Sequence, residues 1–328
     1  MTQGWASLCP FRAKKKKETW ARSPCHEENR FKMAANIIDG KQIGAAIKEQ
    51  LAAELVELKG RGIAVRLATI LVGADAGSTV YAQSQAKTSA AIGIDHVLVH
   101  IDGGAGQAAL ETKIQELNSD PTVSGIMISM PLPKGYDAGR AQNLISPFKD
   151  VEGTGAANLG AIFQGDFTMA PCTAAAAYKC IHSQPAIAVK GAEVVIVGRS
   201  TIVGKPLAMM LVQDHATVTV CHTATKDMMG HCRSADILVA AAGKANLITA
   251  EYVRPGAVVI DVGINRVNVT DASGAVKAKT VGDVDYESVS NAASWITPVP
   301  GGVGPVTVAM LLKNTVEAAK KIAYRKSV

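Results

Sequence analysis

The stretch Val194–Pro206 reads Val-Val-Ile-Val-Gly-Arg-Ser-Thr-Ile-Val-Gly-Lys-Pro, and it decides the fold of the chain. Four apolar β-branched residues lead directly into Gly198. A second glycine follows at Gly204, and a helix-compatible segment, Leu207–Gln213, comes after it. This order is typical of a buried parallel strand, a tight turn and a helix whose N-terminus can hold a phosphate. The glycine spacing differs from the usual dinucleotide fingerprint, so an ordinary strand–helix turn remains open.

The end of the next predicted strand, Ala216–Cys221, indicates which dinucleotide would bind. NAD sites usually place Asp or Glu there, about twenty residues after the first glycine, to bind the ribose hydroxyls. Here Cys221 is followed by His222 and Thr223, without a carboxylate, whereas Arg199 in the first turn offers a guanidinium to a 2′-phosphate. Bonds between a guanidinium and a phosphate are strong, so the sequence favours NADP over NAD.

Length and composition bound the class of protein. The 328 residues suit two domains, and the content of 48% apolar but only 4% aromatic residues predicts aliphatic cores with buried parallel strands. No uncharged apolar run approaches the ~18 residues that a membrane-spanning helix needs. The six cysteines have no C-x-x-C spacing, which predicts free thiols in a reducing compartment. We expect a cytoplasmic protein, with a mitochondrial location left open.

The positive charge is concentrated at the N-terminus. Residues 1–33 hold eight Lys or Arg and three Glu, which accounts for five of the six excess positive charges. The rest of the chain is nearly neutral, and nothing in it indicates a nucleic-acid surface. The basic run Lys14–Lys17 is typical of a targeting sequence, but the nearby glutamates fit a transit peptide poorly. We treat 1–33 as a disordered extension, with Met33 as an alternative start.

From Ile37 onward helical and strand periods alternate. Apolar residues four apart predict an amphipathic helix over Lys41–Lys59. The remaining predicted elements of the first half are strands at Val65–Val72 and His96–Ile101, helices at Ser78–Ala91 (with Ser78 as its cap) and Gln107–Leu117, and the apolar segment Gly125–Met130. In the first half of residues 134–175, no helix or strand is obvious from the sequence.

A second run of strands and helices begins near Glu193. Its predicted strands are Glu193–Val197, Ala216–Cys221, Asp236–Ala241, Ala257–Val262 and Trp295–Thr297. The Pro- and Gly-rich segment Pro298–Pro305 predicts an irregular loop, and Val306–Lys321 predicts a closing helix. The fold class is therefore α/β: two lobes with parallel sheets, the second a Rossmann-like dinucleotide-binding domain, with the ligand cleft between them.

Few residues indicate chemistry by themselves. Tyr81 and Gln85 lie four apart on one predicted helix and so share a face, whereas Lys87 points elsewhere. Glu152 follows a polar loop. The seven histidines have no metal-ligand spacing, and we expect no metal. For Tyr81 alone, a packed core tyrosine is the competing interpretation.

Eight ordered segments together resemble the methylenetetrahydrofolate dehydrogenase/methenyltetrahydrofolate cyclohydrolase family over nearly all of residues 35–322. The two most specific are the Gly198 turn and the Pro- and Gly-rich loop. The segments are Ile37–Lys41, Tyr81 with Gly93-Ile94, Pro131–Pro133, Lys149–Val151, Pro171–Thr173, Gly198–Gly204, Val281–Val284 and Thr297–Pro305.

The resemblance implies a folate cleft between two lobes and a homodimer formed through the second lobe. It implies a folate-binding catalytic domain at 34–175 plus 307–328 and an NAD(P)-binding domain at 176–306, with the final helix packed on the first lobe. Tyr81 would stack on a tetrahydrofolate derivative, and the loop bearing Pro300, Gly301 and Gly302 would close over it. Cofactor-binding residues would be Gly198, Arg199, Ser200, Ile202, Gly204, Thr223 and Ile264.

This chain departs from the family pattern within the folate site. The family's catalytic lysine is replaced by Gln85, and the glutamine that supports it by Ser129. The family aspartate that binds the pterin edge is replaced by Glu152. After Pro171–Thr173, the usual proline and glycine are both alanines. The dinucleotide loop, in contrast, is intact.

These departures affect the two family reactions differently. Hydride transfer from the methylene carbon needs positioning and no side-chain proton. Cyclohydrolysis needs a group that carries protons, and an amide such as Gln85 cannot ionise near neutrality. We therefore expect an NADP-dependent 5,10-methylenetetrahydrofolate dehydrogenase with impaired cyclohydrolase. The alternative is a non-catalytic or regulatory paralogue that still binds cofactor, and a dehydrogenase for another small substrate is a third interpretation.

Overall fold

The computed structural model describes residues 34–73, 76–270 and 276–327, with the side chains of 76–81, 83, 84, 326 and 327 outside that description. The extension 1–33, predicted to be disordered, also lies outside it. The described chain is an α/β fold with two parallel sheets, as the sequence predicts.

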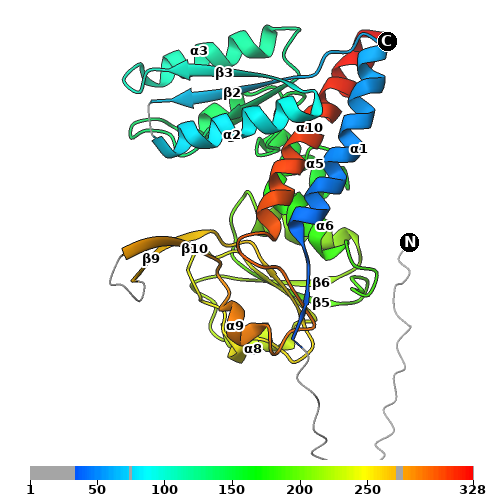
Figure 1. Ribbon diagram of the computed structural model, residues 1–328, viewed down its shortest axis with the longest axis vertical. Helices are drawn as coiled ribbons and strands as arrows, with labels where there is room; N and C mark the ends of the chain where they lie inside the picture. Colours follow the sequence, from blue (N-terminus) through cyan, green and yellow to red (C-terminus); the bar gives the residue numbers. More distant parts are fainter. Residues whose placement is uncertain (1–33, 74–75, 271–275, 328) are drawn as a thin grey trace, which may run out of the picture. The chain divides into compact units, whose positions relative to one another are not determined.

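The first sheet has three parallel strands in the order β3-β2-β4 (Figure 1). Its centre is β2 (Arg66–Val72), which pairs with β3 (Asp95–Ile101) and β4 (Gly125–Ile128). Six of the seven residues of β2 are buried, so this strand is a continuous apolar run. The helices α2 (Ala76–Ile92) and α3 (Gly106–Ser119) connect the strands in turn.

The second sheet has six parallel strands in the order β1-β11-β8-β7-β5-β6. The first strand of the described chain therefore lies in the second sheet, beside a strand from near the end of the chain. The strands are β1 (Asn36–Ile37), β5 (Glu193–Val197), β6 (Thr217–Cys221), β7 (Ile237–Ala240), β8 (Val258–Asp261) and β11 (Trp295–Ile296). The helices of this half are α7 (Gly204–Gln213), α8 (Met228–Ser234) and α9 (Tyr286–Val289), with a 3₁₀ turn, η1 (Ala250–Tyr252).

Three helices pack together beside the sheets. The final helix, α10 (Val303–Ser327), contacts both α1 (Gly40–Gly60) and α6 (Cys172–Ile181), and it also contacts β2 and β4 of the first sheet (Figure 1). The predicted packing of the last helix on the first lobe is confirmed.

The local sequence explains why α1 forms where it was predicted. The Asp39 carboxylate caps the helix by accepting from the backbone N–H groups of Lys41 and Gln42. Ile47, Leu51 and Leu55, spaced four apart, are all buried.

Five details differ from the sequence prediction. Helix α2 begins at Ala76, a strong helix former, so Ser78 lies inside the helix and is not its cap. Helix α10 begins at Val303, within the predicted loop, because a proline is tolerated in the first turn. A short helix, α4 (Ala138–Leu144), lies in a stretch where no helix was obvious from the sequence. The structure also adds α5 (Ala156–Phe163) and an antiparallel hairpin of β9 (Asn265–Thr270) and β10 (Val276–Val281).

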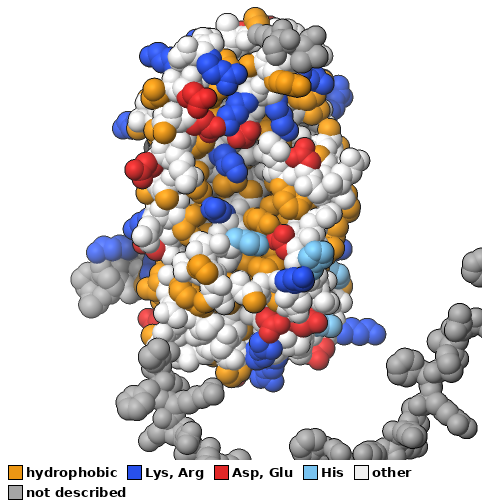
Figure 2. Space-filling model, turned by 90° about the vertical axis from the view of Figure 1, so that its right-hand side faces the viewer, with side chains coloured by type: hydrophobic (Ala, Val, Ile, Leu, Met, Phe, Trp, Pro, Cys, Tyr) orange, Lys and Arg blue, Asp and Glu red, His pale blue; other side chains and the backbone are white. Residues whose placement is uncertain are grey.

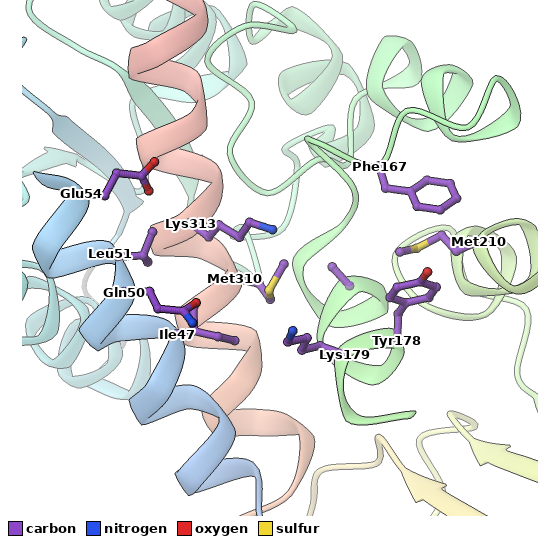
Figure 3. A pocket seen from close by; sticks show the side chains of 11 residues that line it. Ile47, Gln50, Leu51, Glu54, Phe167, Tyr178, Lys179, Met210, Met310 and Lys313 are labelled. Atoms are coloured by element: carbon purple, nitrogen blue, oxygen red, sulfur yellow. The ribbon is translucent and has the colours of Figure 1, made fainter. Parts of the chain in front are cut away.

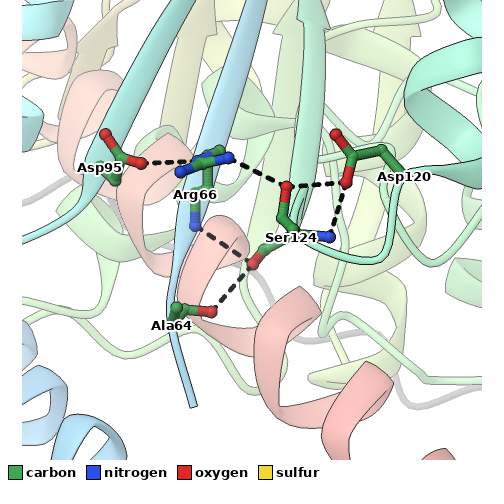
Figure 4. A network of polar contacts seen from close by, with 6 residues as sticks. Ala64, Arg66, Asp95, Asp120 and Ser124 are labelled. Atoms are coloured by element: carbon green, nitrogen blue, oxygen red, sulfur yellow. Dashed lines mark hydrogen bonds and ion pairs between the residues drawn. The ribbon is translucent and has the colours of Figure 1, made fainter. Parts of the chain in front are cut away.

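A polar network joins the amino-terminal ends of the first sheet's strands (Figure 4). Arg66, at the start of β2, donates from Nε to the Asp95 carboxylate at 2.5 Å and from a terminal nitrogen to Thr122 Oγ1 at 2.9 Å. Its backbone N–H donates to Ser124 Oγ, beside β4. These contacts hold together the amino-terminal ends of the strands. The opposite, carboxyl-terminal ends are where a ligand would bind.

Lys149 stabilises the connection after β4 from a buried position. Its Nζ donates to the carbonyl oxygens of Leu117 at 2.9 Å and Asp120 at 2.7 Å, at the C-terminus of α3. We expect Lys149→Met to lower the free energy of unfolding by about 2–4 kcal/mol, because two carbonyl groups lose a charged donor. Urea unfolding measures this loss.

Lys113→Met is the matched control, since the contact of Lys113 among the described residues is an exposed ion pair with Glu116. The free energy of unfolding of the Lys113→Met variant should fall by less than about 0.5 kcal/mol. Equal losses in the two variants would contradict a stabilising role for Lys149.

Candidate functional site

Two glycines shape the turn after β5. Gly198 has φ +134°, and a Cβ there would lie 2.1 Å from the Ala241 carbonyl oxygen. A Cβ on Gly204 would lie 2.0 Å from the carbonyl oxygen of Gly198. Since only glycine allows both approaches, the turn closes tightly on itself and places the N-terminus of α7 against the end of β5.

This turn lies where the strand order reverses. From β5 the chain passes to β6 on one side and then to β7 on the other, so the switch point lies between β5 and β7. Ligands of open α/β sheets bind at the carboxyl ends of the strands at such a point. Gly198 follows β5 and Ala241 follows β7, and the close approach of these two residues marks the floor of the crevice.

The residues around the turn fit a dinucleotide with a 2′-phosphate. Arg199 and Ser200 are exposed beside the turn, and Ser200 Oγ accepts from the Val203 N–H at 3.1 Å. Thr223, after β6, is also exposed, and no carboxylate stands at the end of that strand. The exposed guanidinium of Arg199 and the exposed hydroxyl of Thr223 suit a phosphate.

A pocket of about 200 Å³ brings together three predicted site residues, Gln85, Glu152 and Ile202. Ile202 extends from the dinucleotide turn into this pocket, so the predicted cofactor and substrate sites meet there. The remaining lining residues, which the sequence prediction did not select, are Met127, Met130, Gln142, Thr154, Pro171, Cys172, Thr173, Thr307, Val308 and Leu311. Most are apolar or small, so no single residue among them stands out in the sequence.

Charge is scarce in this pocket. Among its described lining residues, Glu152 is the only one with an ordinarily charged side chain, and none is Lys, Arg or His. Gln85 is only 4% exposed, whereas Lys87 is exposed to solvent. The prediction that Gln85 and Lys87 lie on different faces of the helix is confirmed.

Several buried polar atoms near the pocket have no hydrogen-bond partner among the described residues. They are both amide atoms of Gln85 and the hydroxyl oxygens of Ser89, Ser129 and Thr154. Ser129 is 4% exposed but does not line the pocket itself. Buried polar groups are normally satisfied, so the unsatisfied amide of Gln85 is suited to a polar ligand.

Tyr81 lies on α2, one turn before Gln85. Its side chain falls outside the described residues, so its predicted stacking stays a prediction.

The loop Pro298–Pro305 lines a second hollow, of about 190 Å³. Three predicted residues, Pro300, Gly301 and Gly302, lie in it together with Ile264. The sequence prediction missed three polar lining residues, Lys41, Asp261 and Thr280. Arg199, Ser200 and Thr223 line neither hollow.

The pKa of Glu152 is raised to about 7. Burial is the main cause, the negative charge of Asp150 adds to it, and a backbone hydrogen bond from Ile128 partly opposes it. Asp150 is itself held by the N–H groups of Gly153 and Gly155, at 3.0 and 2.8 Å, and by the amide of Asn158. The turn therefore keeps the two carboxyl groups close together.

Glu152→Gln should remove a pH-dependent loss in the free energy of unfolding. Ionising Glu152 costs free energy only in the folded protein, because its pKa is raised there from 4.5 to about 7. The penalty is absent below pH 4.5, grows as pH rises to about 7 and is complete above it. Between pH 5 and 8 the unmodified protein should lose about 2–3 kcal/mol relative to the variant in urea unfolding. A difference that is constant with pH would contradict the raised pKa.

Another hollow lies between α1, α6 and α10 (Figure 3). Lys313 and Lys179 extend into it, and Ile47, Leu51 and Met310 supply apolar walls. Figure 2, which shows the right-hand side of Figure 1, has a row of Lys and Arg side chains with apolar side chains gathered below it. The hollow contains none of the predicted site residues, and we leave it outside the candidate site.

Other groups that could carry chemistry are sparse. Cys172, Cys180, Cys221 and Cys232 are buried free thiols, as predicted for those four. Within residues 34–73, 76–270 and 276–327, no cluster of His, Cys, Asp or Glu could hold a metal ion. The same part of the chain contains no helix with the length and apolarity to cross a membrane.

Two family models match the two halves of the chain. Residues 38–152 match the catalytic domain of tetrahydrofolate dehydrogenase/cyclohydrolase, and residues 171–323 match its NAD(P)-binding domain. Bifunctional protein FolD of Moorella thermoacetica is 46% identical over 88% of this chain and its own full length.

Two solved structures are similar over 88% of the chain. The FolD methylenetetrahydrofolate dehydrogenase/cyclohydrolase of Campylobacter jejuni has a TM-score of 0.82 at 42% identity over 99% of its length. The Trypanosoma brucei enzyme, solved with NADP cofactor and an inhibitor, has a TM-score of 0.82 at 36% identity over 98% of its length. The chain therefore belongs to the tetrahydrofolate dehydrogenase/cyclohydrolase family.

Proposed function

We propose that the protein is an NADP-dependent 5,10-methylenetetrahydrofolate dehydrogenase whose cyclohydrolase step is impaired. The observation that carries the proposal is the pocket around Gln85. The buried amide of Gln85 occupies the position at which the sequence resemblance implies a lysine, and none of the described residues that line the pocket carries a positive charge.

Hydride transfer is compatible with the residues that line this pocket. NADP, when bound, supplies the hydride acceptor. The protein's own task is to hold the folate's methylene carbon against the cofactor. Ile202 joins the dinucleotide turn to the folate pocket, and the Pro300–Gly302 loop and Ile264 bound the neighbouring hollow. No side chain has to move a proton in this step.

Substrate binding would use the remaining polar groups. Glu152 would accept from the amide edge of the pterin, and the Gln85 amide would donate and accept beside it. Hydrogen bonds from the pterin to Glu152 would favour its ionised form, so binding would lower its pKa and remove it as a proton donor. Arg199, Ser200 and Thr223 would bind the cofactor phosphates.

Cyclohydrolysis is the step that loses its catalyst. Water adds to the methenyl carbon and the ring then opens, which requires a group that gains and releases a proton. Gln85 cannot ionise near neutral pH, and Ser129 is a weak substitute for a supporting glutamine. A positioned acid or base usually contributes about 10²–10⁴-fold, and we expect a loss within that range.

The clustering of substitutions at Gln85, Ser129 and Glu152 also favours a second candidate, a paralogue that binds cofactor without catalysis. Glutamate is one methylene longer than the aspartate it replaces, and a displacement near 1 Å can lower a rate about 100-fold. The homodimer through the second lobe, the domain limits at 175–176 and 306–307, and the cytoplasmic location remain predictions from the sequence.

The purified full chain, mixed with methylenetetrahydrofolate and NADP, tests the proposal. NADP reduction with formation of the methenyl product supports the dehydrogenase. Binding of NADP without any reduction would support the non-catalytic paralogue.

A further inference from the structure

Two buried aspartates lie behind the predicted cofactor site and have no role in the chemistry described above. Asp283 is 0% exposed and Asp261 is 3% exposed. They come from segments far apart in the sequence: Asp261 ends β8, and Asp283 follows the hairpin. Burying two carboxylates is costly unless hydrogen-bond donors satisfy each of them.

The Asp283 carboxylate joins two loops. One oxygen accepts from the backbone N–H groups of Ala242 at 2.6 Å and Gly243 at 2.8 Å, directly after β7. The other accepts from the side-chain amide of Asn265 at 2.9 Å, at the start of the hairpin. A single side chain thereby fixes the turn after β7 to the segment that carries Ile264.

The Asp261 carboxylate holds Asp283 in place. It accepts from the backbone N–H groups of Asp283 at 2.9 Å, Val284 at 3.0 Å and Gly263 at 2.9 Å. The backbone N–H of Asp261 donates to Thr297 Oγ1 at 2.7 Å, immediately before the Pro298–Pro305 loop. The network therefore extends to the loop beside the second hollow.

The neighbouring glycines show that this arrangement requires close packing. A Cβ on Gly263 would lie 2.2 Å from an Asp283 carboxylate oxygen, and one on Gly282 would lie 1.7 Å from an Asp261 oxygen. The Asp283 carboxylate thus occupies the space that a side chain at position 263 would need. The Asp261 carboxylate occupies the space that a side chain at position 282 would need. This explains the Val281–Val284 motif, to which the proposed chemistry assigns no role.

We propose that Asp283 is a positioning residue for the dinucleotide. The turn that it fixes includes the residues directly after Ala241, whose carbonyl forms the floor under Gly198 at the switch point between β5 and β7. Asp283 sets the position of this turn relative to Asn265 and Ile264, and so the width of the crevice. The inference rests on the proposed use of the crevice for NADP.

Asp283→Asn tests this role in the full-length protein, because the uncharged amide has one acceptor oxygen and cannot accept both from the N–H groups of Ala242 and Gly243 and from the Asn265 amide, as the carboxylate does. We expect the dissociation constant for NADP to rise on the order of tenfold or more. The KM for methylenetetrahydrofolate should change by less than about twofold. Isothermal titration and steady-state kinetics give the two values.

Asp236→Asn is the matched control. Asp236 lies just before β7, at its other end, and likewise accepts from a backbone N–H, that of Glu193 at 2.8 Å. Its loss should leave NADP affinity unchanged. If Asp283→Asn does not fold, Asn265→Ala removes one partner of the same carboxylate and should weaken NADP binding about threefold or more.

Unchanged NADP affinity in a folded Asp283→Asn protein would overturn the inference. So would an equal loss of cofactor and folate affinity, or an equal effect of Asp236→Asn, since each indicates a general structural role. If the unmodified protein binds no NADP, the proposed function itself fails, which separates the two outcomes.

Discussion

Gln85→Lys is expected to raise methenyltetrahydrofolate cyclohydrolase activity on the order of 100-fold. The substituted ammonium group would lie in a pocket whose described lining has no other cation. Burial lowers the pKa of a lysine, which brings it nearer to neutral pH, where a proton carrier works best. The hydrolysis of the methenyl compound, followed by its absorbance, measures the gain.

Lys87→Gln is the control for this experiment. Lys87 lies close to Gln85 in the sequence, but its side chain is exposed and lies on another face of α2. Its replacement should leave both activities as they were. Absence of any gain in Gln85→Lys would mean that Ser129 and Glu152 set the limit, and loss of residual hydrolysis in Lys87→Gln would identify Lys87 as the proton carrier.

Gly204→Ala is expected to weaken NADP binding at least about 100-fold. The new Cβ would lie 2.0 Å from the Gly198 carbonyl oxygen and 3.2 Å from the Arg199 Cα. The turn must therefore open, and the N-terminus of α7 shifts away from the phosphate position, where a displacement near 1 Å is costly. Titration with NADP measures the loss, and folate binding should persist.

Gly160→Ala provides the comparison, because a Cβ there would meet no atom within 4 Å. Gly160 lies in α5, where alanine is the better helix former, so NADP affinity should be unchanged. Tight NADP binding by Gly204→Ala would contradict the closed turn as the phosphate site.

The dinucleotide half of the site could be predicted because its determinants are local. Val194–Gly204 contains the strand, both glycines and the start of the helix within one short stretch. The burial of Gln85 and the exposure of Lys87 likewise follow from their spacing on one helix. In both places the periodicity of the backbone fixes the geometry.

The parts that were missed depend on contacts between distant segments or on weak local signals. Asp283 bonds to Ala242 and Gly243 from some forty residues away, and no spacing rule indicates such a pair. Helix α4 has one buried residue, Ala141, so it lacks an apolar stripe. The hairpin β9–β10 is largely exposed on both strands and shows little alternation.

The most direct test of the proposed division between the two reactions is to measure both on one preparation of the full chain. We predict NADP-dependent formation of the methenyl compound, which then accumulates because its hydrolysis is hardly faster than in buffer. Hydrolysis that keeps pace with formation would contradict the proposal.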